Sequence, residues 1–122
     1  DFLICADARQ MEELFTNLLS NAVKYNLDGG RVWLSLKKER KDMVLNVSDN
    51  GVGIPKESLG RIFERFYRVD KGRSRKQGGT GLGLSIVKHI VNFYHGTVKV
   101  VSSQEEGKRG TSFIVRLPIA KE

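Results

Sequence analysis

Three stretches of this 122-residue sequence carry residue types suited to binding a phosphorylated ligand. In the first, Gly79, Gly81 and Gly83 alternate and run directly into a segment with helical apolar spacing. This pattern predicts a loop that feeds a helix, where unpaired backbone N–H groups and the helix dipole suit a phosphate group. The G-x-G-x-G spacing differs from the dinucleotide fingerprint G-x-G-x-x-G, and no Walker A sequence is present. Taken alone, the glycines are also compatible with a flexible linker.

The second stretch is a polar stripe on a predicted helix. Apolar residues recur at i, i+3 and i+4 over residues 8–22, so we expect a helix that is capped by Asp7 and ends between residues 25 and 30. Asparagine is a poor helix former because its amide competes for backbone hydrogen bonds, and a solvated helix face is normally filled with Glu and Lys instead. We therefore favour a ligand-facing stripe over a merely solvated one. Its members are Glu13, Asn17, Ser20, Asn21 and Lys24.

The third stretch is a carboxylate at the end of a predicted strand. Residues 31–38 and 43–49 alternate apolar and polar side chains, which predicts a hairpin of antiparallel strands. Asp49 shares the core-facing parity of the second strand, where a carboxylate costs free energy unless it accepts hydrogen bonds. Asp-Asn-Gly is also an ordinary turn sequence. Against that alternative, no return strand follows, and Gly51 and Gly53 indicate close approach of the backbone to another group.

The elements that must position these residues fit one domain over residues 1–122, since a chain of this length can bury a core. The connection from Pro55 to Thr80 is long, which is typical of a lid, a binding loop or a disordered segment. It begins with a short helical segment and holds seven basic residues against two acidic ones between positions 61 and 76, most of the net charge of +7. Further strands are predicted at residues 2–6, 98–102 and 111–117, with Thr111 facing inward, and a second long helix at residues 83–94.

Composition excludes several other classes of protein. No apolar run approaches the roughly 20 residues that span a bilayer, and the start of the chain lacks a signal-peptide layout. We expect a cytoplasmic domain, and its abrupt start leaves open that it was excised from a membrane-anchored parent. The lone Cys5 cannot form an internal disulfide. His89 and His95 lack a nucleophile partner or a second metal ligand at suitable spacing, so we assign them no catalysis.

Read together, four motifs resemble those of the catalytic ATP-binding domain of two-component sensor histidine kinases. They occur in the family's order and cover nearly the whole chain. The wider superfamily includes gyrase, the ninety-kilodalton heat-shock chaperone and the mismatch-repair ATPase. The resemblance implies an α/β two-layer sandwich, in which a mixed, mostly antiparallel five-stranded sheet packs under three helices beside a long ATP lid. The motifs are the N box at residues 17–25, the first glycine box at 49–55, the F box at 63–68 and the second glycine box at 79–84.

The resemblance also implies that the ligands are ATP and Mg²⁺. Asp49 would accept from the adenine amino group, with Thr111 in support through water. Asn21, with Asn17 beside it, would bind Mg²⁺, which keeps waters and bridges phosphate oxygens. Asn21, Lys24 and Arg68 are implied as catalytic, with Arg68 at the γ-phosphate. The nucleotide-binding positions implied in this way are Asn17, Asn21, Lys24, Tyr25, Asp49, Gly51, Gly53, Ile54, Tyr67, Arg68, Gly79, Thr80, Gly81, Leu82, Gly83, Leu84 and Thr111.

The residue at position 17 distinguishes two mechanisms. In the superfamily's ATP hydrolases, a Glu one turn before the metal-binding Asn activates water, whereas Asn17 cannot act as a base at neutral pH. We therefore expect slow hydrolysis and transfer to an external acceptor. In the family this acceptor is a histidine on a separate dimerisation domain, with a pattern similar to Ser-His-Glu-Leu-Arg that this sequence lacks. The implied partners are that domain and, through it, a response regulator, and not nucleic acid.

Three alternative functions remain at this point. The nearest is a related kinase that phosphorylates protein serine, such as an anti-sigma factor, although the F box and the long lid favour the histidine class. A nucleic-acid-binding domain is suggested by charge alone and leaves Asp49 and the asparagine stripe unexplained. A degenerate nucleotide-binding scaffold would be expected to have lost one or more of the four motifs.

Overall fold

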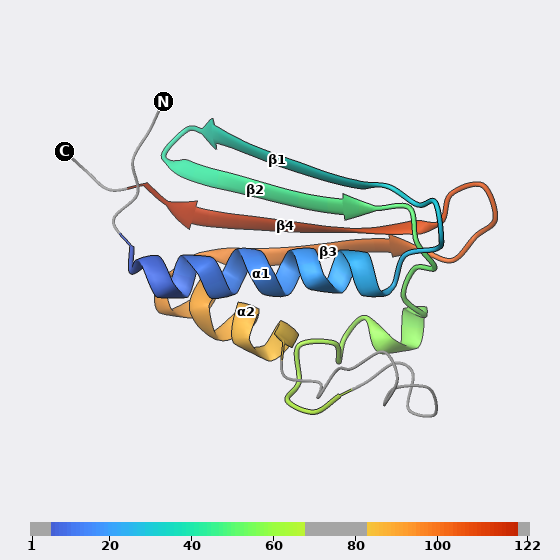
Figure 1. Cartoon of the computed structure of the whole chain (residues 1–122). Helices are drawn as coiled ribbons and strands as arrows, with labels where there is room; N and C mark the ends of the chain where they lie inside the picture. Colours follow the sequence, from blue (N-terminus) through green and yellow to red (C-terminus); the bar gives the residue numbers. More distant parts are fainter. Residues whose placement is uncertain (1–5, 68–82, 120–122) are drawn as a thin grey trace.

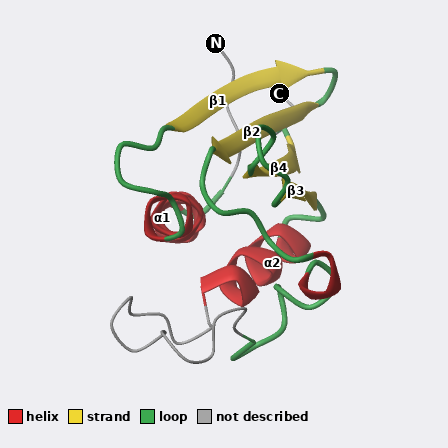
Figure 2. Ribbon diagram, turned by 90° about the vertical axis from the view of Figure 1, so that its right-hand side faces the viewer, coloured by secondary structure: helices red, strands yellow, loops and turns green. Residues whose placement is uncertain are grey.

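The computed structural model describes residues 6–67 and 83–119, which form one antiparallel sheet and two α-helices. The strands lie in the order β1-β2-β4-β3. Figures 1 and 2 show both helices on the same side of the sheet, so the domain is a two-layer α/β sandwich. The elements follow one another as α1 (Ala8–Lys24), β1 (Val32–Glu39), β2 (Asp42–Asp49), the 3-10 helix η1 (Lys56–Ser58), α2 (Gly83–Phe93), β3 (Thr97–Ser103) and β4 (Gly110–Pro118).

The expected mixed sheet of five strands under three helices is confirmed only in part. The described residues form four strands, paired antiparallel throughout, and two α-helices. Of the strand expected at residues 2–6, only Ala6 is described, and it lies outside any strand. The expected short helix is the 3-10 turn η1, followed by further turns up to Phe66. Its backbone bonds join residues three apart, and Gly60 lowers helix propensity, which explains why no α-helix forms there.

Helix α1 begins where the sequence predicts and ends at Lys24, one residue before the expected range of 25–30. The Asp7 carboxylate accepts the backbone N–H of Gln10 at 3.1 Å and so satisfies one of the unpaired donors at the helix start. The helix ends at Lys24, and the backbone N–H of Tyr25 bonds to the carbonyl of Asn21 at 3.2 Å. This end brings the polar stripe of the helix close to the start of the chain segment that leads into β1.

Helix α2 ends in a Schellman motif. The N–H of Gly96 bonds to the carbonyl of Val91 at 2.8 Å, and the N–H of His95 bonds to the carbonyl of Asn92 at 3.0 Å. This motif places His95 in the left-handed region, at φ +60°, a conformation that glycine adopts more easily. His95 therefore has the position at a helix end that the sequence predicts.

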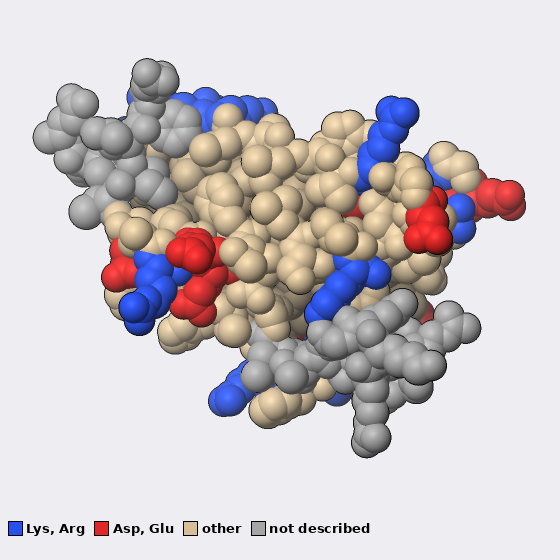
Figure 3. All heavy atoms as spheres, viewed as in Figure 1, with Lys and Arg blue, Asp and Glu red and all other residues tan. Residues whose placement is uncertain are grey.

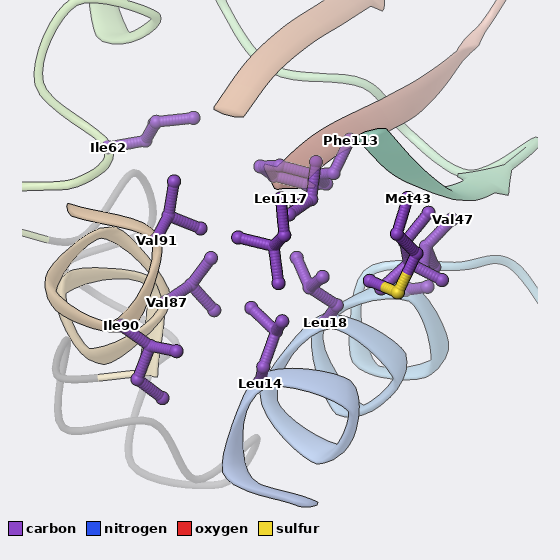
Figure 4. Packing of buried hydrophobic residues seen from close by; sticks show 13 residues of the cluster. Leu14, Leu18, Met43, Val47, Ile62, Val87, Ile90, Val91, Phe113 and Leu117 are labelled. Carbon is purple, nitrogen blue, oxygen red and sulfur yellow. The ribbon is translucent and has the colours of Figure 1, made fainter. Parts of the chain in front are cut away.

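The hydrophobic core fills the space between the two helices and the sheet. Helices α1 and α2 pack against each other, α1 also contacts β2, and α2 contacts β3 and β4. Full burial of one Leu, Val or Phe side chain contributes about 1.5–3 kcal/mol, so this core fixes the helices firmly on the sheet. Figure 4 labels Leu14, Leu18, Met43, Val47, Ile62, Val87, Ile90, Val91, Phe113 and Leu117 among its residues.

Neither helix in the described ranges combines the length and apolar character that crossing a membrane requires.

Candidate nucleotide-binding site

The helix-covered face of the sheet changes from apolar to polar at one end. The last row of that face has Asp49 on β2, Thr111 on β4 and Ser102 on β3, each directly opposite its neighbour. Because this end adjoins the core, three polar side chains there need hydrogen-bond partners. We call these three residues the polar row. The two preceding rows are apolar and consist of Leu36, Leu45, Val115 and Val98, and of Leu34, Val47, Phe113 and Val100.

Asp49 is the charged member of the polar row. Its Oδ1 accepts the backbone N–H of Gly51 at 2.8 Å. Burial raises the pKa of Asp49 above its ordinary value, and the backbone N–H groups of Gly51 and Thr111 offset part of that rise. The carboxylate is thus half-buried and fixed in direction, and as an anion it offers only acceptors. It is suited to a neutral ligand group that donates a hydrogen bond, such as an amino group.

The first glycine box packs closely against other backbone. A Cβ at Gly51 would overlap the carbonyl oxygen of Tyr25 and lie 2.9 Å from the Cα of Asn26. Gly53 has φ +77°, and a Cβ there would lie 2.7 Å from the carbonyl carbon of Ser103. The sequence predicts that the backbone at these glycines lies close to another group, and this is confirmed. Gly51 lies against the chain at the end of α1, and Gly53 lies against the end of β3.

A hydrogen-bond network ties this glycine box to the polar row. The hydroxyl of Ser102 accepts the backbone N–H of Ile54 at 2.7 Å and donates to the carbonyl of Gly110 at 3.0 Å. The same oxygen lies 2.8 Å from the hydroxyl of Thr111, which is 6% exposed. The loop after β2 is thereby held against the end of the β3–β4 hairpin, beside the Asp49 carboxylate.

The polar stripe of α1 faces the beginning of α2. The side-chain amide of Asn17 donates to the carbonyl of Glu13 at 2.8 Å, which fixes the direction of its oxygen. That Oδ1 lies 3.0 Å from where a Cβ on Gly83 would be, so the absent side chain of Gly83 permits this approach. Asn21 lies one turn further along the same helix face and is half-buried, as is Lys24. The structure thus joins the N box to the end of the second glycine box.

Three other predicted residues make structural contacts. The hydroxyl of Tyr67 bonds to that of Ser58 at 2.7 Å, and the guanidinium of Arg61 lies 4.6 Å from the centre of the Tyr67 ring. Tyr25 accepts the N–H of Val52 through its carbonyl at 3.2 Å. Leu84 packs against the core. These contacts hold the F box and the first glycine box in place, and any contact of the same residues with nucleotide stays a prediction.

Five predicted site residues lie outside the described residues. They are Arg68, Gly79, Thr80, Gly81 and Leu82. Their expected contacts with phosphate stay predictions.

The sequence could have revealed Ser102, which our reading missed. Ser102 shares the parity of Val98 and Val100, so the pattern already placed a hydroxyl at the end of a core-facing row. The same criterion, a polar residue that shares the parity of core-facing apolar residues, identifies Asp49 and Thr111.

Two asparagines were also missed. Asn50 accepts the backbone N–H of Arg31 through its side chain at 2.7 Å, and Asn26 donates its amide to the carbonyl of Arg31 at 2.8 Å. Together they fasten the segment between α1 and β1 to the first glycine box. The sequence carries no signal for this, because both asparagines occur in segments that look like ordinary turns.

The charge and donor types around the site are mixed. Figure 3 shows mainly residues other than Lys, Arg, Asp and Glu over the middle of the face seen in Figure 1, with a few basic side chains among them and most acidic side chains toward the two ends. Among the described residues, no three His, Cys, Asp or Glu side chains come together as a metal site. The amides of Asn17 and Asn21 supply oxygen donors, which suit Mg²⁺ when phosphate oxygens and water complete its shell.

Fold and site together define an α/β sandwich domain of the ATP-binding ATPase type. Residues 6–121 match the family described as Histidine kinase-, DNA gyrase B-, and HSP90-like ATPase. The chain belongs to this family.

Within the family, the chain is similar to sensor histidine kinases. It is 41% identical to the sensor histidine kinase WalK of Bacillus subtilis (strain 168) over its whole length and 20% of WalK. It is 42% identical to the signal transduction histidine-protein kinase ArlS of Staphylococcus aureus (strain USA300) over 85% of this chain and 22% of ArlS. The chain therefore spans about a fifth of the length of these relatives.

Solved structures show the same relationship. The mycobacterial sensor histidine kinase MprB superposes with a TM-score of 0.84 at 32% identity, covering 98% of this chain and 78% of the MprB chain. Full-length ShkA, solved in complex with AMPPNP, gives a TM-score of 0.79 at 30% identity over 98% of this chain and 23% of the ShkA chain. The four-stranded sheet and two helices are thus those of a histidine kinase catalytic domain.

Proposed function

We propose that this domain binds Mg-ATP and transfers the γ-phosphoryl group to a histidine on a separate dimerisation domain, as the catalytic half of a sensor histidine kinase. One observation carries the proposal: a half-buried carboxylate, Asp49, ends a core-facing row and is held by a hydrogen bond from the backbone N–H of Gly51. Such a carboxylate is costly for folding and is typical of a binding site. The similarity to WalK and ArlS supports the reaction class.

At the base end, Asp49 accepts from the amino group of adenine, with Thr111 beside it. Gly51, Gly53 and Ile54 form the wall next to the carboxylate, since the loop that carries them is packed onto Tyr25 and β3. The AMPPNP complex of ShkA supports an ATP-like ligand for this fold.

At the phosphate end, Asn21 and Asn17 ligate Mg²⁺ and Lys24 contacts phosphate. A magnesium ion held there would neutralise part of the phosphate charge. Catalysis of phosphoryl transfer consists mostly of such charge stabilisation and of positioning. The start of α2 at Gly83 presents backbone N–H groups toward the same region. Arg68 and residues 79–82 complete the phosphate contacts in this proposal.

Asn17 favours transfer to an external acceptor over hydrolysis. It stands where an ATP hydrolase has a general base, and its amide is neutral and bonded to the carbonyl of Glu13. The Glu13 side chain is exposed and lies a further turn away. We expect the acceptor histidine and any membrane anchor in other parts of the parent protein. We expect the response regulator to be a separate downstream partner.

The test is reconstitution of phosphotransfer. The domain is mixed with labelled ATP, Mg²⁺ and candidate histidine domains, and label on each protein is measured. We expect label on the histidine domain and none retained by the catalytic domain. Asn21→Ala should reduce transfer roughly 100-fold or more, because it removes a fixed electrostatic group from the site.

A matched control is Asn92→Ala, the same substitution at an exposed position of α2. It should leave transfer unchanged. Equal labelling by Asn21→Ala and the wild type would remove Asn21 from its assigned role. Rapid ATP hydrolysis by the domain alone, or stable label on the domain itself, would contradict the proposed reaction.

A further inference from the structure

The hydroxyl of Ser102 lies at the junction of three segments that contact the base end of the site. It is 2.7 Å from the backbone nitrogen of Ile54, 3.0 Å from the carbonyl oxygen of Gly110 and 2.8 Å from the hydroxyl oxygen of Thr111. A serine hydroxyl has one proton to donate and two lone pairs to accept with. Three neighbours therefore occupy its one donor and both acceptor positions. Which neighbours can donate and which can accept decides where the Ser102 proton points.

Only one arrangement of the protons makes all three contacts hydrogen bonds at once. The N–H of Ile54 can only donate and the carbonyl of Gly110 can only accept, so Ser102 receives from the first and gives its single proton to the second. In this arrangement, the remaining lone pair of Ser102 accepts the proton of the Thr111 hydroxyl, whose oxygen lies 2.8 Å away. As a result, the Thr111 hydroxyl has no proton left for a ligand and offers lone pairs alone.

We propose that Ser102 is a positioning residue that makes the base end of the site select a 6-amino purine over a 6-oxo purine. With the Thr111 proton held by Ser102, both Asp49 and Thr111 present acceptors only. The amino group of adenine is a donor at position 6, whereas hypoxanthine and guanine carry an acceptor there. The inference rests on the proposed function, because it assumes that the base lies beside Asp49.

Loss of the Ser102 hydroxyl has a specific consequence. In Ser102→Ala, the Thr111 hydroxyl is released and can rotate to donate to a 6-oxo group. A neutral hydrogen bond made or lost changes binding about 3- to 10-fold. The ratio of dissociation constants for ITP and ATP should therefore fall about 3- to 10-fold. The two nucleotides share the same triphosphate, so any change at the phosphate end cancels in this ratio.

The experiment measures binding of Mg-ATP and Mg-ITP by calorimetry to the whole chain, for the wild type and first for three variants, Ser102→Ala, Ser102→Thr and Ser112→Ala. Ser102→Thr keeps the hydroxyl and should restore the wild-type ratio. Ser112→Ala is a matched control, because Ser112 makes a hydroxyl–hydroxyl contact of 2.7 Å with Ser48 on the opposite face of the sheet. Ser112→Ala should leave the ITP/ATP ratio unchanged. If Ser102 had a purely structural role, Ser102→Ala would weaken the binding of both nucleotides equally and would also leave the ratio unchanged, which would overturn the proposal.

Thr111→Val keeps the proposal falsifiable if Ser102→Ala unfolds, because it removes the Thr111 acceptor and should lower the ITP/ATP ratio by itself. Where Ser102→Ala folds, combining it with Thr111→Val should add nothing. An unchanged ratio in Thr111→Val, or additive effects in the pair, would overturn the role of Ser102 while leaving ATP binding intact. Failure of the wild type to bind ATP would instead overturn the proposed function, and this inference with it.

Discussion

The two ends of the candidate site, the proposed base end for adenine and the proposed phosphate end, are built in different ways. At the base end, Asp49, Thr111 and Ser102 belong to adjacent strands, and hydrogen bonds join them to one another and to the backbone of the following loop. At the phosphate end, Asn17 and Gly83 come from two helices that are joined through the core, not through the sheet. The base end is therefore held by a network of hydrogen bonds, whereas the phosphate end is held by the packing of one helix on another.

Because of this difference, substitutions at the two ends should affect stability and nucleotide binding differently. A substitution at the base end disturbs a network that also holds strands and loops together, so it should change stability as well as binding. A substitution at the phosphate end touches side chains on a helix surface and should change binding with little effect on stability. The same chemical change made at both ends tests this contrast.

The largest effect is expected for Gly53→Ala. The new Cβ would require a left-handed backbone at φ +77° and would overlap the backbone of Ser103, so the free energy of unfolding should fall by about 2–4 kcal/mol. Chemical denaturation measures it. Gly29→Ala is the control, since Gly29 has the same φ of +77° with no atom within 4 Å of the added Cβ, and it should cost only about 1 kcal/mol. Equal losses in the two variants would show that the packing against β3 is unimportant.

Asp49→Asn should weaken ATP binding about 10- to 100-fold, because it replaces a charged acceptor with a neutral amide. The same variant should be more stable than the wild type at pH 7. Burial raises the pKa of Asp49, so the ionised carboxylate opposes folding above that pKa, and its protonated form is favoured in the folded state.

The stability gained by Asp49→Asn should therefore shrink as the pH falls, and should be nearly absent below 3.8, the unfolded value for Asp. Unfolding curves measured from pH 3 to pH 7 check the sign. A gain that grows toward acid pH would mean that the bonds from Gly51 and Thr111 outweigh burial at this carboxylate.

Gly83→Ala applies the glycine substitution to the phosphate end. The added Cβ would lie 3.0 Å from Oδ1 of Asn17, a close contact that a shift of a few tenths of an ångström in this side chain would relieve, and alanine is the better helix former. The free energy of unfolding should change by less than about 1 kcal/mol, while affinity for ATP falls more than affinity for adenosine. A loss of stability as large as that of Gly53→Ala would remove the contrast between the two ends.

The smallest effect is expected for His95→Gly at the far end of α2. Glycine relieves the left-handed conformation at φ +60° and should raise the free energy of unfolding by about 0.5–1 kcal/mol. ATP affinity should stay the same, because the change lies at the opposite end of the helix from Gly83. Altered affinity, measured by calorimetry, would show that the phosphate end depends on the whole helix and not on its first turn.

Much of this site was predictable from periodicity and residue type. Asp49 stood out because a carboxylate shared the parity of buried residues, and Asn17 and Asn21 stood out because they are poor helix formers at helical spacing. Ser102 could have been found in the same way. The bonds from Asn26 and Asn50 to Arg31 could not, since they join segments up to 19 residues apart whose local sequence predicts only turns.

By itself, the sequence determined where α1 begins and, to within one residue, where it ends, the antiparallel hairpin of β1 and β2, and the inward direction of Asp49 and Thr111, since these follow from local spacing and capping. Only the tertiary structure decided that the polar row is continuous from β2 to β3, because β4, which follows β3 in a hairpin, pairs with β2 across a long sequence separation. It also decided that the segment after η1 forms successive turns rather than an α-helix, and that Asn17 faces Gly83. Those outcomes depend on how the helices pack on the sheet, which no local pattern specifies.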